Sequence, residues 1–108
     1  MTTFDKRKDA FENKYAHDEE LRFRAEARRN KLLGLWAAEL MGRKGDAAAA
    51  YARSVVEADF AEKGEEDVFR KVRDDLAAAG VVQSEHQIRR TMEELMAQAI
   101  DQVRVEQK

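Results

Sequence analysis

The sequence predicts an all-α protein, a four-helix bundle of antiparallel type with an unusually long first helix, and three observations support this fold class. Proline is absent, and the residue mix favours helices over strands. Apolar residues recur at i, i+3, i+4 and i+7, which is typical of helices that bury one face. Glycines separate four such stretches by short connections, which favour antiparallel neighbours. The 108 residues suffice for one core.

The first predicted helix spans residues 4–41. It ends in a short turn in which Gly42 and Gly45 bracket two basic residues. Only its second half is apolar enough to join a core. The positions predicted to be buried there are Leu21, Ala25, Leu32, Leu35, Trp36 and Leu40.

The remaining predicted helices span residues 47–63, 66–79 and 85–106. Asp46 is predicted to cap the start of the second helix, and Ser84 with Gln87 to form a capping box for the fourth. Gly64 and Gly80 are placed where helices end. The positions predicted to be buried are Ala48, Tyr51, Val55, Val56, Ala58, Phe60, Val68, Phe69, Val72, Leu76, Ala79, Ile88, Met92, Leu95, Met96, Ala99 and Val103.

The first 19 residues do not follow the core pattern. Phe4, Phe11 and Tyr15 share one narrow side of a helix, and most of the other residues are charged. A helix over residues 4–41 would be about 57 Å long at about 1.5 Å per residue, which exceeds a small bundle. An isolated helix of this length is marginal in water. We therefore predict a mobile, projecting or weakly helical segment at residues 1–19 and a helical bundle at residues 20–108.

Composition excludes several classes of protein. The chain has no cysteine, so a disulfide framework or a thiolate zinc site cannot form. No apolar run approaches the roughly 18 residues of a membrane span. The N-terminus lacks the apolar stretch of a signal peptide. These features predict a cytoplasmic protein without direct membrane insertion.

No constellation of residues suggests catalysis or a bound metal. His17 and His86 are the only histidines, and Glu-x-x-His pairs of a di-metal bundle would need glutamates where Lys14 and Gln83 stand. The turn from Gly42 to Gly45 lacks the frame of a phosphate-binding loop and follows no strand. We expect no catalytic residues, no metal and no cofactor, and hence a protein that is not an enzyme.

The run from residue 21 to residue 31 holds five basic side chains against Glu26. One interpretation is a nucleic-acid or anionic-ligand module that uses the basic run Arg22–Lys31. The favoured interpretation is a solvated helix face paired with the acidic patch His17–Glu20 and with acidic faces elsewhere in the bundle. Residues 1–31 carry nine basic and seven acidic side chains, a small excess for a nucleic-acid groove. We therefore expect no nucleic-acid partner.

The aromatic stripe near the N-terminus is open to two interpretations. It is either a helix end packed loosely on its own bundle, or a helix-in-groove ligand whose aromatic anchors are ringed by charges of both signs. The second interpretation predicts a partner-binding site. Its residues are Phe4, Asp5, Arg7, Lys8, Phe11, Glu12, Lys14 and Tyr15.

The segment AHDEELRFRAEARRNKLLGLWAAELMG, with Phe4-Asp5 and Ala10-Phe11-Glu12 before it, resembles the zeta subunit of alphaproteobacterial F-type ATP synthases. The resemblance implies an inhibitor of ATP hydrolysis whose partner is the catalytic head of the synthase. In that family the N-terminal segment enters a catalytic α/β interface and reaches the γ subunit, while the bundle anchors it. The resemblance further implies that the protein associates with the membrane-bound synthase on its cytoplasmic side.

Carried onto this chain, the resemblance gives each N-terminal residue an expected role. The three aromatic side chains would fill apolar pockets. Arg7, Lys8 and Lys14 would pair with acidic groups of the enzyme, and Asp5 and Glu12 with basic ones. Weak nucleotide binding by the bundle is a further hypothesis, since a regulator of an ATPase has use for a nucleotide sensor, although no motif supports it.

Overall fold

The computed structural model describes residues 19–61 and 64–106, and these residues form four helices and no strand. In chain order the helices are α2 (Glu19–Leu40), α3 (Asp46–Ala61), α4 (Glu65–Ala78) and α5 (Glu85–Glu106). The all-α class and the four-helix bundle are thereby confirmed. The part of the predicted first helix before Glu19 lies outside the described residues.

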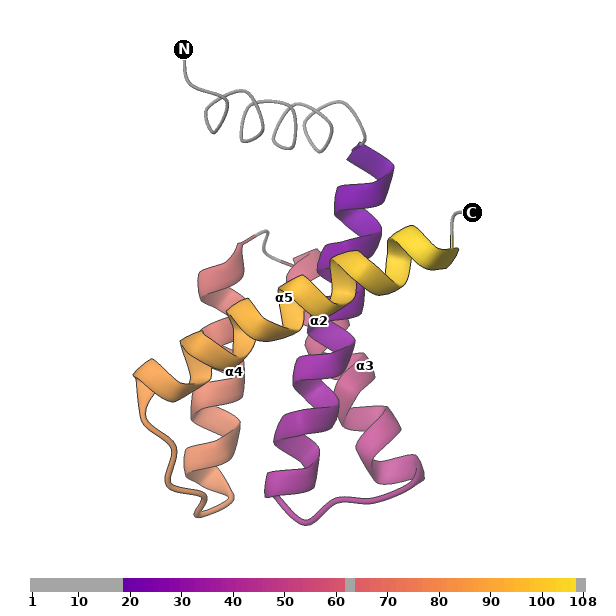
Figure 1. Ribbon diagram of the computed structural model, residues 1–108. Helices are drawn as coiled ribbons and strands as arrows, with labels where there is room; N and C mark the ends of the chain where they lie inside the picture. Colours follow the sequence, from indigo (N-terminus) through magenta and orange to yellow (C-terminus); the bar gives the residue numbers. More distant parts are fainter. Residues whose placement is uncertain (1–18, 62–63, 107–108) are drawn as a thin grey trace.

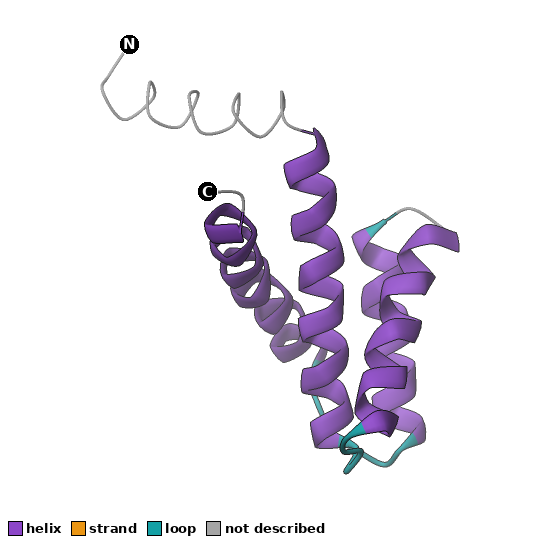
Figure 2. Ribbon diagram, turned by 90° about the vertical axis from the view of Figure 1, so that its right-hand side faces the viewer, coloured by secondary structure: helices purple, strands orange, loops and turns teal. Residues whose placement is uncertain are grey.

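Helix α2 is the centre of the molecule. It packs against each of the other three helices, whereas the described backbones of α3 and α5 do not come within 8 Å of each other, measured between Cα atoms. Figure 1 shows α2, α3 and α4 side by side, with α5 crossing α2 and α4 obliquely. Figure 2, from the side, shows α5 and the α3–α4 pair on opposite sides of α2. The first turns of α2 extend beyond the other helices (Figure 1).

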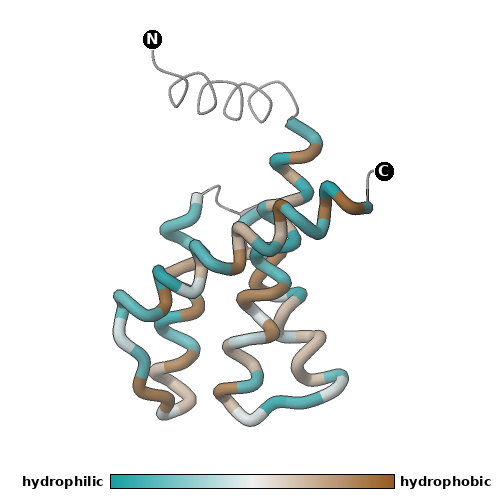
Figure 3. Tube along the Cα trace, in the orientation of Figure 1, coloured by the Kyte–Doolittle hydropathy of each residue, from teal (hydrophilic) through white to brown (hydrophobic). Residues whose placement is uncertain are grey.

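The core consists mainly of aliphatic side chains from all four helices, together with the aromatic rings of Phe69 and Tyr51. Apolar positions alternate with polar ones along each helix, as Figure 3 shows by hydropathy. In α4 the predicted face is confirmed except for Ala79, which is exposed. The cluster of buried residues comprises Leu33, Ala37, Ala38, Tyr51, Val55, Val68, Phe69, Val72, Leu76, Ile88 and Met92.

For α2 the predicted stripe is partly wrong. Leu35 and Leu40 are each 37% exposed, whereas Leu33, Ala37 and Ala38 are fully buried. The reason is that α2 packs against helices on opposite sides, so its buried positions do not form a single stripe. A one-face pattern therefore selects the wrong leucines for a helix at the centre of a bundle.

Glycines at helix ends shape two of the three turns. After α2, Arg43 donates to the Ala38 carbonyl at 2.9 Å and Gly42, with φ of 79°, donates to that of Glu39 at 3.0 Å. The same pair of bonds closes α4, where Gly80 has φ of 76°. Both are Schellman motifs, which satisfy the last carbonyls of a helix and need a left-handed residue.

Of the two predicted N-terminal caps, one is confirmed and one is wrong. Ser84 Oγ accepts from the Gln87 amide at 3.1 Å, and Gln87 Oε1 accepts from the Ser84 amide at 3.3 Å, which is the expected capping box. Asp46 is not a cap, because α3 already begins there and Gly45 accepts the first helical hydrogen bond. Gly64, predicted to follow the end of the helix before it, stands at the N-cap of α4, and residues 62–63 ahead of it lie outside the described residues.

Candidate functional site

All eight residues of the predicted partner-binding site precede the described part of the chain. Phe4, Asp5, Arg7, Lys8, Phe11, Glu12, Lys14 and Tyr15 lie outside the described residues. What the structure places is their attachment point, the start of α2 at Glu19. Glu19 and Glu20 lie in this first turn, where their negative charges interact favourably with the positive end of the helix dipole. This interaction stabilises the start of α2.

The basic run on α2 is neutralised by acidic side chains of the bundle. Arg28 binds Glu106 at the far end of the chain, with 2.7 Å between guanidinium nitrogen and carboxylate oxygen, and Gln102 at 2.9 Å. Arg24 lies 3.8 Å from the same glutamate, and Arg22 pairs with Glu26 at 3.3 Å. The hydrogen bond from Arg28 holds the pKa of Glu106 below its ordinary value.

The next arginine of the run is buried and joins three helices. Arg29 is 6% exposed, and its Nε donates to Asn30 Oδ1 at 2.9 Å. Asn30, fully buried, donates in turn to Asp59 Oδ2 at 3.2 Å on α3, while Arg29 lies 3.8 Å from Glu65 on α4. Four of the five basic residues of the run therefore lie near acidic side chains of the described helices, but Arg29 is buried, whereas the favoured interpretation predicted a solvated face.

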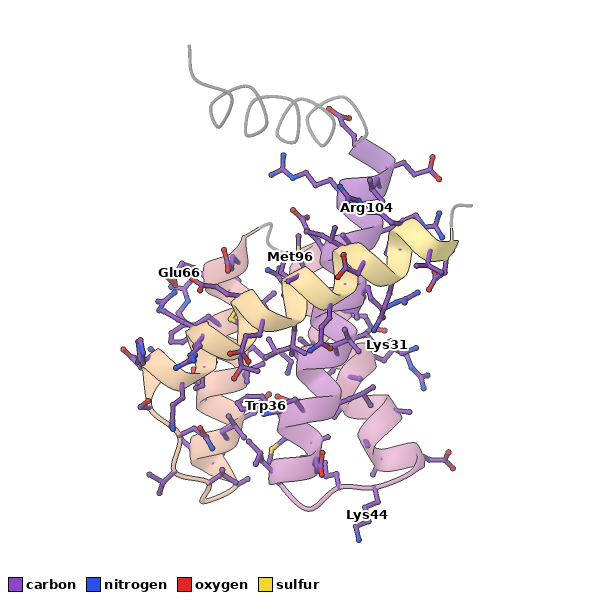
Figure 4. All side chains as sticks on the ribbon, in the orientation of Figure 1. Lys31, Trp36, Lys44, Glu66, Met96 and Arg104 are labelled. Carbon is purple, nitrogen blue, oxygen red and sulfur yellow. The ribbon has the colours of Figure 1, made fainter. Side chains whose placement is uncertain are left out.

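A groove of about 960 Å³ lies between the first half of α2, the middle of α5 and the junction of α3 with α4. Figure 4 shows Met96 of α5 between the start of α4, where Glu66 lies, and the first half of α2. Acidic side chains outnumber basic ones around it by five to two. The lining residues are Glu19, Arg22, Phe23, Glu26, Arg29, Asp59, Gly64, Glu65, Met92, Glu93, Met96, Ala97 and Ile100.

Sequence reasoning missed this groove. Its residues come from all four helices and share no motif, so only their meeting in space shows it. The one available signal was Phe23, an aromatic residue on the charged half of the first helix, which is 51% exposed. The groove begins at Glu19, directly beside the predicted partner-binding segment.

Other parts of the chain offer little chemistry. In the described ranges, no group of three or more His, Cys, Asp or Glu side chains is placed to hold a metal ion. The turn from Gly42 to Gly45 connects α2 to α3, and its Arg43 stacks 5.1 Å from the centre of the Tyr51 ring. None of the helices in the described part is long and apolar enough to cross a membrane.

Comparison with known proteins identifies the family. The sequence model of one protein family, ATPase inhibitor subunit zeta, matches residues 1–102. A solved structure, described as a solution NMR structure of a protein, is 52% identical and has a TM-score of 0.70. The match covers 80% of this chain and 98% of that one. No curated protein matches the chain.

The family match extends across the predicted partner-binding segment and nearly all of the bundle. Membership supports a role as an inhibitor of the ATP synthase's ATPase activity, in association with that enzyme. It also agrees with the resemblance carried by the run from Ala16 to Gly42. From the match over residues 1–102, the chain belongs to the ATPase inhibitor subunit zeta family.

Proposed function

We propose that this protein stops ATP hydrolysis by the F-type ATP synthase with residues 1–19, which enter a catalytic α/β interface as a wedge and reach the γ subunit. The bundle, residues 20–108, anchors the wedge. The protein makes or breaks no covalent bond in this action. The observation that carries the proposal is the family match over residues 1–102, which includes the whole segment.

The architecture of the described residues suits an anchor. The first turns of α2 extend beyond the other helices, so the chain before Glu19 is attached at a projecting end of the molecule (Figure 1). Deeper in the bundle, Leu33, Ala37 and Ala38 of the same helix are completely buried. Because the second half of α2 is fixed in the core, a force on the start of α2 acts on the whole bundle.

The sequence of the segment suits a wedge that orders on contact. A helix of fewer than about 20 residues is marginal on its own, so most of its order comes from the partner. Phe4, Phe11 and Tyr15 supply the apolar anchors, and truncation of such anchors typically costs about 2 kcal/mol or more of binding. Charged residues beside them select for a complementary cleft.

Site-specific photo-crosslinking tests which subunits the segment contacts. A benzophenone amino acid placed at Phe11 is expected to crosslink to the α or β subunit of the cognate enzyme, and one at Phe4 to reach γ as well. The reaction is run during ATP hydrolysis, because the interface opens during turnover, and products are identified by mass spectrometry.

The matched control carries the same amino acid at Val82. This residue is 95% exposed and lies in the turn between α4 and α5, away from the start of α2. It is expected to give no crosslink to the catalytic interface. Crosslinks from position 82 but none from positions 4 and 11 would show that the bundle, and not the N-terminal segment, enters the enzyme.

A further inference from the structure

The groove beside Glu19 has the chemistry of a site for a basic, aromatic helix. Met96 and Ile100 of α5 supply apolar surface, and Phe23 extends it onto α2, whereas Met92, which also lines the groove, is buried. Met96 and Ile100 are only partly buried by the bundle itself. An apolar surface with a charged border is typical of helix-in-groove recognition.

The border of the groove is negatively charged. Arg22 is paired with Glu26, and Arg29 lies near Glu65, so the two basic residues are already matched. Among the described residues, Glu19 and Glu93 have no ion pair. An occupant with basic side chains beside its apolar anchors therefore gains from this border, whereas an anionic ligand is repelled.

We propose that the groove is a docking site for residues 4–15 of the same chain. In this closed state the wedge is held on its own bundle and is withdrawn from the enzyme. The closed state itself does not depend on the ATP synthase, whereas its regulatory consequence rests on the function proposed above.

The charge pattern of the segment matches the groove. At helical spacing Lys8 falls on the same face as Phe4, Phe11 and Tyr15, and Arg7 and Lys14 border that face on one side. Aromatic side chains would lie against Met96 and Ile100, and the basic border would face Glu93. Asp5 and Glu12 fall on the other border of the segment, away from the side that carries Arg7 and Lys14.

The tether makes even a weak contact effective. Tyr15 is four residues before Glu19, a span of at most about 14 Å, so a reversal at residues 16–18 returns the segment to the groove. A short linker gives an effective concentration of the order of millimolar. The apparent affinity for the enzyme is then the intrinsic affinity multiplied by the fraction of molecules whose segment is not docked in the groove.

Paramagnetic relaxation in the full-length protein tests the closed state directly. The chain has no cysteine, so Ala10→Cys gives one position for a nitroxide label, off the aromatic face and next to the basic border of the segment. Methyl labelling of methionine gives four signals, of which Met96 reports on the groove and Met41 on the distant end of α2. We expect Met96 to broaden and Met41 to keep its intensity.

Two variants separate docking from mere proximity. Glu93→Lys reverses the border of the groove, and Phe11→Ser removes an aromatic anchor. Each is expected to restore much of the Met96 signal, as is raised salt. Glu39→Lys is the matched control, since Glu39 is exposed on α2 far from the groove, and it is expected to leave the broadening unchanged.

Three outcomes would overturn the proposal. The Met96 methyl signal keeps its full intensity in the nitroxide-labelled protein, or the Met41 signal broadens as much as that of Met96. The third outcome is a Met96 signal that is as broad in the Glu93→Lys variant as in the parent. A mixture of nitroxide-labelled protein with methionine-labelled protein that carries no nitroxide tests for docking between molecules. If Met96 broadens only in this mixture, the occupant is a second molecule, which also contradicts the proposal. Circular dichroism checks that each variant remains folded.

An inhibition assay then tests the regulatory consequence. Glu93→Lys frees the wedge without altering it, so its half-inhibitory concentration is expected to fall by about two- to fivefold relative to Glu39→Lys. Broadening that depends on Glu93 with no inhibition by any variant would support the closed state and reject the proposed function. Equal inhibition by both variants, with the closed state present, would reject its regulatory role.

Discussion

Tyr51 is held by charged groups at its hydroxyl and on its ring. Tyr51 is 5% exposed, and its hydroxyl donates a hydrogen bond to Asp75 Oδ2 at 2.9 Å. Lys71 binds the same carboxylate at 3.0 Å, and its Nζ lies 5.5 Å from the ring centre. Burial, followed by the hydrogen bond to Asp75, raises the pKa of Tyr51 well above its ordinary value. At the residue scale, this contact joins α3 to α4 and makes their packing sensitive to alkali.

The raised pKa predicts the direction of a pH effect. Since the folded-state pKa lies above the unfolded value near 10, the contribution to stability is complete below about pH 10 and is lost as pH rises further. Melting temperatures from pH 8 to 11.5 are expected to fall more steeply for the parent than for Tyr51→Phe. The variant should lose about 1 kcal/mol at neutral pH, with the hydrogen bond. Parallel curves above pH 10 would contradict this account.

At the scale of elements, α2 packs closely on α3 at Gly34. A Cβ added to Gly34 would lie 2.5 Å from the Ala52 Cα and 3.3 Å from a methyl group of Val55. The first of these is a backbone atom, which no rotamer change can move. The glycine therefore allows the two helices to pack with their backbones in contact.

Gly34→Ala is expected to destabilise the bundle despite the better helix propensity of alanine. Forcing the helices apart typically costs about 1–3 kcal/mol, which corresponds to a fall in melting temperature on the order of 10 °C for a domain of this size. Thermal unfolding followed by circular dichroism provides the measurement. A melting temperature equal to or above that of the parent would show that α2 and α3 separate without loss.

The helices and their ends were largely predictable, because periodicity, glycines and the Ser84 capping box are local features. The buried face of α2 was not, since it depends on neighbours on opposite sides of that helix. The burial of Arg29 and Asn30 was missed for a related reason. Their partners Asp59 and Glu65 stand about thirty residues further along the chain, and no local pattern brings them together.

At the scale of the whole molecule, we propose that the chain divides into an anchor, residues 20–108, and an inhibitory segment, residues 1–19. The described residues form one core, and the predicted inhibitory residues all precede it. The candidate site could be proposed from the sequence because aromatic spacing, charge and family resemblance fall in the same 19 residues. The groove could not, because it exists only where four helices meet.

The most direct test of this division is a titration of ATP hydrolysis by the cognate catalytic head with the intact chain and with a chain that lacks residues 1–19. The main cluster of buried residues runs from Leu33 to Met92, and the buried residues before it, Leu21 and Ala25, also follow the cut, so the shortened chain is expected to keep its helical circular dichroism and cooperative melting. The account predicts inhibition by the intact chain and none by the folded, shortened chain. Equal inhibition by both would contradict the claim that the N-terminal segment is the inhibitor.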